Sequence, residues 1–365
     1  MTLKQVFSST ALLMAFALNG CGGSSSGGGS SGAANVYMAG VTSYTSTGNG
    51  IATDWKNGTP TNLTTGAEGA TAYSIAVESS CDVYVAGDTY DATTANGVAT
   101  YWKNGTATNL TDGTEYADAN AIAVDSSGNI YVAGDTYDAT TGYSIATYWK
   151  NGTATNLTNG MGNGSAYSIT VDSSGNVYMA GVTTTTVGLT ENSAATYWKN
   201  GTPTNLTDGT EKAVVAQAIT VDSSGDVYVA GDTYDATAGR QMAAYWKNGT
   251  ATNLTDGTEY ADANAIAVDS SGNIYVAGNT TSATTGNAIA TYWKNGTATN
   301  LTDGAENAYA NSIAVDSSGN VYVAGMAANA STGYNVATYW KNGAATNLTD
   351  GTSPAAVYGM ALSSE

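Results

Sequence analysis

Short apolar runs separated by Gly-, Ser- and Asn-rich turns extend along the chain from residue 35 onward. In one representative unit this pattern predicts four strands, at residues 121–125, 129–134, 145–150 and 153–158. The tight turn Ser126-Ser127-Gly128-Asn129 joins the first two strands, and Asn151-Gly152, a strong hairpin signal, joins the last two. A longer loop, Asp135 to Tyr143, connects the second strand to the third. Each unit is therefore predicted to be a four-stranded antiparallel meander.

The first two strands of this unit carry apolar residues on both faces, in Ala121-Ile122-Ala123-Val124 and Ile130-Tyr131-Val132-Ala133. A sheet with one solvated face would instead alternate apolar and polar positions. Both faces must then be covered, as in a propeller, where every blade packs between two neighbours. Because the chain also lacks the 3.6-residue periodicity of an amphipathic helix, we expect an all-β fold.

The unit is repeated along the chain, and the tryptophans mark the repeats. Each tryptophan is followed by Lys-Asn-Gly, and the motif recurs every 47 to 49 residues, at Trp55, Trp102, Trp149, Trp198, Trp246, Trp293 and Trp340. The stretch from Tyr101 to Gly134 recurs without change from Tyr245 to Gly278, which indicates duplication. Four strands in about 47 residues match one propeller blade, so we expect seven blades.

The two ends of the repeat array are complementary. The first repeat begins at residues 35–40, a second-strand sequence, and lacks the strand that should precede it. The chain ends with residues 356–363, which align with the first strand of the next repeat at residues 72–77. The C-terminal strand is therefore predicted to join the N-terminal blade, which would close the ring over residues 35–365 and remove its open edges.

Two segments, residues 122–134 and 314–325, resemble the seven-bladed β-propeller (SBBP) repeat of bacterial surface proteins and are similar to NHL propeller repeats. The resemblance implies that the Ile-Ala-Val-Asp strand lies innermost in each blade and the Thr-Asn-Leu-Thr strand outermost. It implies little about function, since one fold serves many activities. The first repeat departs from the pattern at Asp54, where the other repeats have Tyr, and at Cys81, where they have Gly.

The N-terminus reads as an export signal, assigned to residues 1–21. An apolar stretch, Ala11 to Leu18, leads to Leu18-Asn19-Gly20-Cys21, which resembles the lipobox of bacterial lipoproteins. That resemblance implies a diacylated Cys21 as the first mature residue and, because Gly22 and not Asp follows it, an outer-membrane location. The alternative is an ordinary signal peptide with an incidental cysteine.

A Gly/Ser-rich linker at residues 22–34 has the composition of a flexible tether. No later segment approaches the ~20 apolar residues that span a bilayer, so we expect the lipid to be the membrane anchor. With Cys21 assigned to the lipid, Cys81 is left without a cysteine partner, and we expect no internal disulfide. Cys81 replaces a turn glycine, where a positive φ would cost a residue with a Cβ atom roughly 1–2 kcal/mol, and we interpret it as tolerated drift in a duplicated array. The alternative is a free thiol able to join two chains.

The composition argues against several classes of partner and several kinds of catalytic site. The net charge of −19, with 10 basic and 29 acidic residues, argues against nucleic acid and against docking on anionic lipid. The chain has no histidine, which excludes Ser-His-Asp and Cys-His triads and His-based metal sites. One arginine, Arg240, is too few for sialidase-like chemistry. A glycosidase needs only two carboxylates, but the acids recur in several repeats, which favours a multivalent surface over an enzyme.

The antiparallel order of the strands divides the loops between two faces. The short turns share one face, and they place seven lysines in a ring there: Lys56, Lys103, Lys150, Lys199, Lys247, Lys294 and Lys341. We interpret the ring as solubilising hairpin tips and balancing the Asp-Ser-Ser-Gly carboxylates; the alternative is an anion-binding ring.

The other face, which we call the long-loop face, collects acids and tyrosines. The residues from the Asp-Thr-Tyr-Asp motifs are the candidate ligand-binding residues: Asp88, Tyr90, Asp91, Asp135, Tyr137, Asp138, Asp232, Tyr234 and Asp235. Further acids and tyrosines are predicted between blades: Asp112, Glu115, Tyr116 and Asp118, with the copies Asp256, Glu259, Tyr260 and Asp262. Tyrosine rings with carboxylates suit sugar recognition, and clustered carboxylates suit Ca²⁺, although no loop has the spacing of a known calcium loop. The remaining interpretation is a solvated acidic surface.

We therefore expect a monomeric, non-catalytic, lipid-anchored cell-surface scaffold that binds glycan or protein and needs no cofactor. Two alternatives stay open. One is a structural surface protein without a specific ligand, and the other is a carboxylate-dependent carbohydrate-active enzyme.

Overall fold

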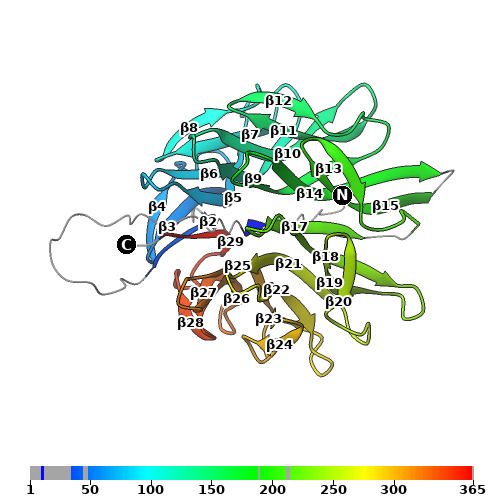
Figure 1. Ribbon diagram of the computed structural model, residues 1–365. Helices are drawn as coiled ribbons and strands as arrows, with labels where there is room; N and C mark the ends of the chain where they lie inside the picture. Colours follow the sequence, from blue (N-terminus) through cyan, green and yellow to red (C-terminus); the bar gives the residue numbers. More distant parts are fainter. Residues whose placement is uncertain (1–9, 12–33, 44–47, 188–189, 211–213, 364–365) are drawn as a thin grey trace.

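The computed structural model describes residues 10–11, 34–43, 48–187, 190–210 and 214–363, without the side chains of 10–11 and 186–191. The proposed lipidation site Cys21, most of the export signal and nearly all of the linker lie outside the described residues. Within the described ranges the chain forms seven antiparallel sheets arranged in a ring (Figure 1), which confirms the predicted seven-bladed all-β propeller. No helix in these ranges has the length and hydrophobicity of a membrane span.

Six blades follow the chain order inner strand, second strand, third strand, outer strand, whereas blade 1 takes its inner strand from the C-terminus. Blade 1 combines β29 (Ala355–Ser363) with β2 (Asn35–Ser43), β3 (Gly50–Lys56) and β4 (Thr59–Asn62). Blade 2 has β5 (Ala70–Val77), β6 (Val83–Tyr90), β7 (Gly97–Lys103) and β8 (Thr106–Asn109). Blade 3 has β9 (Ala117–Val124), β10 (Ile130–Asp138), β11 (Tyr143–Lys150) and β12 (Thr153–Asn156). Blade 4 has β13 (Gly164–Val171), β14 (Val177–Val187), β15 (Thr190–Lys199) and β16 (Thr202–Asn205).

The remaining blades have the same composition. Blade 5 has β17 (Val215–Val221), β18 (Val227–Asp235), β19 (Arg240–Lys247) and β20 (Thr250–Asn253). Blade 6 has β21 (Ala261–Val268), β22 (Ile274–Thr281), β23 (Ala288–Lys294) and β24 (Thr297–Asn300). Blade 7 has β25 (Ala308–Val315), β26 (Val321–Ala328), β27 (Asn335–Lys341) and β28 (Ala344–Asn347). A further two-residue strand, β1 (Thr10–Ala11), pairs in parallel with β29 at Gly359 and Met360.

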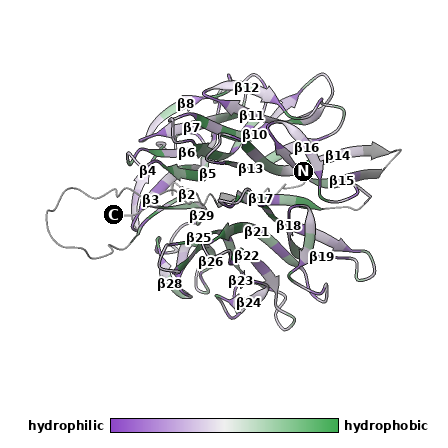
Figure 2. Ribbon diagram, in the orientation of Figure 1, coloured by the Kyte–Doolittle hydropathy of each residue, from purple (hydrophilic) through white to green (hydrophobic). Residues whose placement is uncertain are grey.

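The radial order of the strands agrees with the order that the family resemblance implies. The inner strands of neighbouring blades contact one another around the whole ring, whereas all residues of the outer strands are exposed. Figure 2 shows hydrophobic residues on the inner strands and on the second strands beside them. The core therefore lies between blades and around the central axis, and the outer strands form the rim.

A tyrosine–tryptophan contact recurs where blades meet. The Trp of a third strand packs in one apolar cluster with the Tyr of the second strand in the preceding blade, as for Trp102 with Tyr37 and Trp246 with Tyr178. The seven tryptophans are at most 1% exposed. Each would contribute roughly 3 kcal/mol through burial of apolar surface. The repeated Trp-Lys-Asn-Gly motif thus marks the contacts that hold neighbouring blades together.

Each inner strand contains a β-bulge that sequence analysis missed. The bulged residues are Tyr73, Asn120, Tyr167, Gln217, Asn264, Asn311 and Tyr358. Opposite the bulge in blade 3, the second strand has Gly134, where a Cβ atom would overlap the carbonyl oxygen of Asp118. The Ala-Gly pair at this place in every repeat is the sequence signal of the bulge, because only glycine lets the two backbones approach this closely.

The bulges explain where the predicted strand boundaries were wrong. The inner and second strands continue past the bulge, so Asp135 to Asp138, predicted to open a loop, belong to β10. Likewise Asp118, predicted to lie between blades, is part of β9. In the same way the Asp-Thr-Tyr-Asp motif of blade 5 lies within β18, and all but the last residue of the blade 2 motif lies within β6. These side chains consequently point from sheet faces and not from a loop tip.

The expectation of no internal disulfide is wrong for this structure, in which Cys81 is disulfide-bonded. The sequence argument had removed Cys21 from consideration by assigning it to a lipid. Cys81 adopts φ 70°, in the region that the equivalent turn glycines occupy, such as Gly128 at φ 77°. The predicted backbone strain at this non-glycine residue is therefore present.

Candidate ligand-binding face

The seven lysines of the short-turn face are each engaged within their own blade. Every lysine Nζ lies 4.9–5.2 Å from the ring centroid of the second-strand tyrosine, as Lys150 does over Tyr131. The Tyr131 hydroxyl donates a hydrogen bond to Asp125 at 3.0 Å. Although partial burial acts to raise it, hydrogen bonds from Asn129 and Tyr131 hold the pKa of Asp125 below its ordinary value. The arrangement favours a structural role for the lysine ring.

The first aspartate of each Asp-Thr-Tyr-Asp motif is buried. Asp88, Asp135 and Asp232 are 1%, 8% and 2% exposed, because the extended second strands carry them between neighbouring blades. These three candidate residues therefore cannot reach a ligand at the surface without rearrangement. The structure places them beneath the long-loop face.

At the junction between blades 2 and 3, the buried carboxyl groups of Asp88 and Asp118 lie close enough for the charge of Asp118 to raise the pKa of Asp88. Burial, and then the charge of Asp118, raise the pKa of Asp88 to about 7; burial raises the pKa of Asp118 to about 6. Against the effect of burial, Tyr73 acts to lower the pKa of Asp88 and Tyr116 acts to lower that of Asp118. The Oδ1 atoms of both aspartates lack a hydrogen-bond partner. Asp232 and Asp262 repeat the pair between blades 5 and 6, where burial raises both pKa values.

The second aspartate of the motif stabilises its own loop. Asp91 Oδ1 accepts hydrogen bonds from the backbone N–H groups of Thr93 and Thr94 at 2.7 and 2.9 Å. Asp138 and Asp235 accept the equivalent bonds. Backbone hydrogen bonds, first that of Thr94, lower the pKa of Asp91. This is the turn chemistry of aspartate, and it leaves each carboxylate part of its capacity for other contacts.

The tyrosines of the motif reach solvent to different degrees. Tyr90 and Tyr137 are each 40% exposed, whereas Tyr234 is half-buried. The large apolar side chains that are exposed in the described ranges all belong to long loops, inter-blade linkers or the strand ends beside them: Tyr90, Tyr116, Tyr137, Met161, Tyr260 and Tyr334. They therefore lie on the long-loop face, and the opposite face of the described structure has none.

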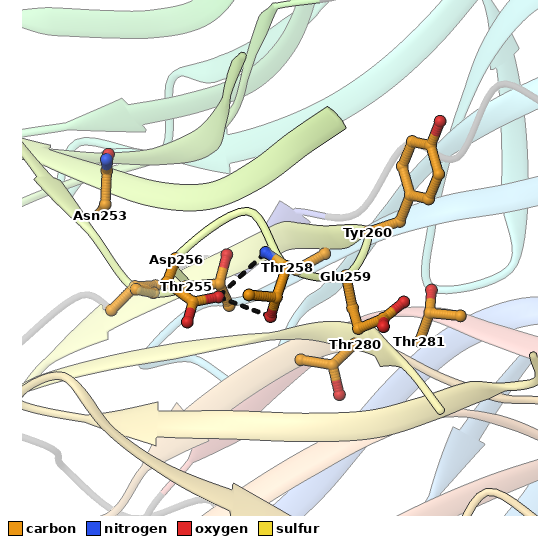
Figure 3. A pocket seen from close by; sticks show the side chains of 10 residues that line it. Asn253, Thr255, Asp256, Thr258, Glu259, Tyr260, Thr280 and Thr281 are labelled. Carbon is orange, nitrogen blue, oxygen red and sulfur yellow. Dashed lines mark hydrogen bonds between the residues drawn. The ribbon is translucent and has the colours of Figure 1, made fainter. Parts of the chain in front are cut away.

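One groove of this face, between blades 5 and 6, has a volume of about 550 Å³. Its lining includes Asp256, Thr258, Glu259, Tyr260, Thr280 and Thr281. Figure 3 shows Thr258 between the two carboxylates, with Thr280 and Thr281 beside Glu259. Asp256 accepts hydrogen bonds from the backbone N–H and the hydroxyl of Thr258, at 3.0 and 2.7 Å. Those bonds, first that of the Thr258 hydroxyl, lower the pKa of Asp256, so the groove is acidic and rich in hydroxyl groups.

Sequence analysis placed Asp256, Glu259 and Tyr260 on this face but did not single out the groove. The missing contributors are Thr280 and Thr281, which stand where blade 3 has Thr136 and Tyr137. The replacement of this tyrosine by Thr281 was the sequence signal that could have indicated the groove. For calcium, the described residues contain no group of three or more Cys, Asp or Glu side chains that could hold a metal ion, so no calcium site is assigned.

Comparison with known proteins supports the fold. The family model described as a β-propeller repeat, SBBP, matches residues 112–139, 256–283 and 301–331. No curated protein sequence matches the chain significantly. The chain is thus a seven-bladed β-propeller that carries SBBP β-propeller repeats.

Solved structures resemble the chain at low sequence identity. The acylaminoacyl peptidase of Pyrococcus horikoshii is 10% identical with a TM-score of 0.53, over 87% of this chain and 51% of that one. A polysaccharide lyase, PL25 ulvanlyase, is 11% identical with a TM-score of 0.48, over 74% and 81% of the two chains. A protein from Lactobacillus plantarum is 13% identical with a TM-score of 0.41, over 90% and 99%. These similarities concern the fold.

Proposed function

We propose that the protein is a non-catalytic binding scaffold that engages glycan or protein ligands through its long-loop face. The observation that carries the proposal is the confinement of the exposed tyrosines to that face among the described residues. Tyrosine offers a large apolar ring with a polar end, which suits both sugar rings and protein surfaces. The acidic groove between blades 5 and 6 adds a concave site on the same face.

The buried carboxyl pairs are the feature that favours the alternative, a carboxylate-dependent carbohydrate-active enzyme. Raised carboxyl pKa values are typical of general acids. However, Asp88 is 1% exposed and Asp232 2%, and a general acid must reach the atom that it protonates. Burial between blades therefore favours a structural role for these aspartates, and the binding function is our proposal.

A glycan array tests the proposal. Purified protein would be screened with calcium and with a chelator, beside a variant carrying Tyr90→Ala, Tyr137→Ala and Tyr234→Ala. We expect binding that the triple variant loses by at least tenfold. A matched control, Lys56→Met with Lys150→Met and Lys199→Met, alters the opposite face and should keep the binding. Equal binding by the triple variant, or turnover of a bound oligosaccharide, would contradict the proposal.

We propose further that the protein is exported as a monomer and held at the outer membrane or cell surface by a lipid on Cys21. The lipobox-like Leu18-Asn19-Gly20-Cys21 and the Gly/Ser tether that follows support this proposal. Mass spectrometry of the N-terminal peptide should show a diacylated cysteine that Cys21→Ser removes. An unmodified Cys21 in the mature protein would contradict it.

A further inference from the structure

Two junctions of the ring are built from the same sequence. Residues 101–134 and 245–278 are identical, so the inter-blade linker and the inner strand are the same between blades 2 and 3 as between blades 5 and 6. The aspartates Asp88 and Asp232, which precede these segments, also correspond. Any difference between the two junctions must therefore arise from the few flanking residues that differ.

Between blades 2 and 3 the junction is closed by Tyr116. A Cβ atom on Gly97 would lie only 2.9 Å from Cε2 of Tyr116, so the ring occupies space that this glycine leaves free. Burial raises the pKa of Asp118 and of Tyr90, and Tyr116 in that position acts to lower each of them. Burial and then the charges of Asp118 and Asp88 raise the pKa of Tyr116, so the tyrosine lies near the carboxyl pair, and the Tyr137 N–H of blade 3 donates a hydrogen bond to the Tyr116 carbonyl oxygen at 2.8 Å.

Between blades 5 and 6 the same tyrosine cannot adopt that position. Gln241 replaces Gly97, and its Cβ atom would meet the ring. The equivalent tyrosine, Tyr260, is 51% exposed, against 38% for Tyr116. It lies beside Arg240, whose guanidinium carbon is 5.7 Å from the ring centroid.

Two further differences shape the open junction. Arg240 also contacts Glu259, with 3.5 Å between Nη1 and Oε2, whereas blade 2 has Asn96 at this position. Thr281 replaces Tyr137, and the smaller side chain lines the groove of about 550 Å³. The groove is therefore the outcome of substitutions around an otherwise unchanged segment.

We propose that the groove between blades 5 and 6 binds an uncharged sugar residue, and that Arg240, Gln241 and Thr281 set it apart from the closed junction. This inference rests on the proposed binding function. The volume lies in the range of small-ligand sites. Threonine hydroxyls can donate to and accept from sugar hydroxyls, and the carboxylates of Asp256 and Glu259 accept from them. The same carboxylates repel uronic acids and sulfated sugars, which sets the preference for uncharged units.

The test uses the closed junction as a template. A closing variant, Gln241→Gly with Thr281→Tyr and Arg240→Asn, gives blade 5 and blade 6 the residues of the closed junction. The matched control, Gly97→Gln with Asn96→Arg, makes two of the reverse changes between blades 2 and 3. Isothermal titration calorimetry would measure neutral oligosaccharides of glucose, galactose, mannose and fucose, with oligogalacturonate as the acidic probe. Melting temperatures within about 3 °C of wild type would show that both variants fold.

We expect one neutral probe to bind at one site per chain, with at least tenfold weaker binding by the closing variant and unchanged binding by the control. Unchanged binding by the closing variant, tighter binding of oligogalacturonate, or no binding of any neutral probe would overturn the inference. The array result separates it from the wider proposal. If glycan binding depends on Tyr90, Tyr137 and Tyr234 but not on the closing variant, the scaffold function stands and this groove is not its site.

Discussion

Met38 of β2 and Met360 of β29 are paired across the sheet of blade 1, although they come from opposite ends of the chain. The pairing extends from Asn35 with Ser363 to Thr42 with Ala355. Main-chain hydrogen bonds of one strand therefore close the ring, and β29 also packs against β5 and β25 on its two sides.

Removal of residues 355–365 should prevent closure, because it deletes β29. Blade 1 would lose its inner strand and expose the edge of β2, and the blades on either side would lose a packing partner. We expect aggregation or loss of cooperative unfolding, measured by light scattering and thermal denaturation. A soluble monomer with the melting temperature of the full chain would show that the ring does not depend on this strand.

The bulges can be tested with one added methyl group. Gly134→Ala would place a Cβ atom against the carbonyl oxygen of Asp118, and overpacking of this kind costs about 1–3 kcal/mol or more. Gly152→Ala is the matched control, because that position has open space and only its φ of 82° is unfavourable, at about 1–2 kcal/mol. Urea denaturation should show the larger loss for Gly134→Ala; equal losses would contradict the close approach of the two strands.

The buried carboxyl pair predicts a pH dependence of stability. With the pKa of Asp88 raised to about 7, the folded state binds more protons than the unfolded chain between about pH 4 and pH 7. This contribution to the free energy of unfolding is present below that window and is lost as the pH rises through it. Asp88→Asn should therefore be stabilised relative to wild type at pH 8, by up to about 4 kcal/mol, and much less at pH 4.

The quantity to measure is the difference between variant and wild type across this pH range, since many other aspartates titrate too. Asp112→Asn is the control, because the Thr114 hydroxyl and then its N–H lower the pKa of Asp112 and the expected difference has the opposite sign. A difference for Asp88→Asn that does not change between pH 4 and pH 8 would contradict the prediction.

Replacement of Tyr131 by Phe should separate the two contacts of this tyrosine. Phe keeps a ring beneath Lys150 but loses the hydrogen bond to Asp125. We expect a loss of about 1.5–3 kcal/mol, typical of a hydrogen bond to a charged group, in chemical denaturation. Lys150→Met, which removes the partly exposed ammonium group, should cost less than about 1 kcal/mol. A larger loss of stability for Lys150→Met than for Tyr131→Phe would show that the lysine–ring contact contributes more than the hydrogen bond to Asp125.

The two cysteines predict mutually exclusive states. The chain has two cysteines, so an intrachain disulfide at Cys81 and a lipid on Cys21 cannot coexist. Mature lipidated protein should therefore show one free thiol, that of Cys81, in a denaturing thiol assay. Protein whose export signal is not processed carries no lipid on Cys21 and should show no free thiol after oxidation. A lipidated protein without a free thiol would require another partner for Cys81.

The fold was predictable because its strongest determinants are local and repeated. Trp102 and its counterparts recur at a nearly constant interval, and the Asn-Gly hairpins adopt the expected positive φ values, with Asn104 at 49° and Gly105 at 79°. The complementary ends implied the closing strand. The bulges were missed because a strand pattern of period two does not reveal one extra residue, although the Ala-Gly pair marks the place.

The candidate site was predicted less well, also because the bulges were missed. Because the strands continue past the bulge, Asp88, Asp135 and Asp232 are buried, while Asp91, Asp138 and Asp235 stabilise their loops. Residue type alone did not distinguish these roles. The groove depends on how Tyr260 packs, and that depends on whether the neighbouring blade has Gly or Gln. Such a relation between distant positions emerges only when the blades are placed side by side.

The bulged asparagines all reach in one rotational sense, since Asn120 donates to Ala166, Asn264 to Ala310 and Asn311 to Val357, each in the following blade. Three of the seven junctions therefore share the same side-chain hydrogen bond to the next blade, and none of these three bonds depends on the number of blades in the ring. An extra copy of such a unit would make the same contacts with the blades on either side of it. Ring size must consequently arise from the angle at which adjacent sheets settle, a collective property that a change in side-chain bulk between blades could shift.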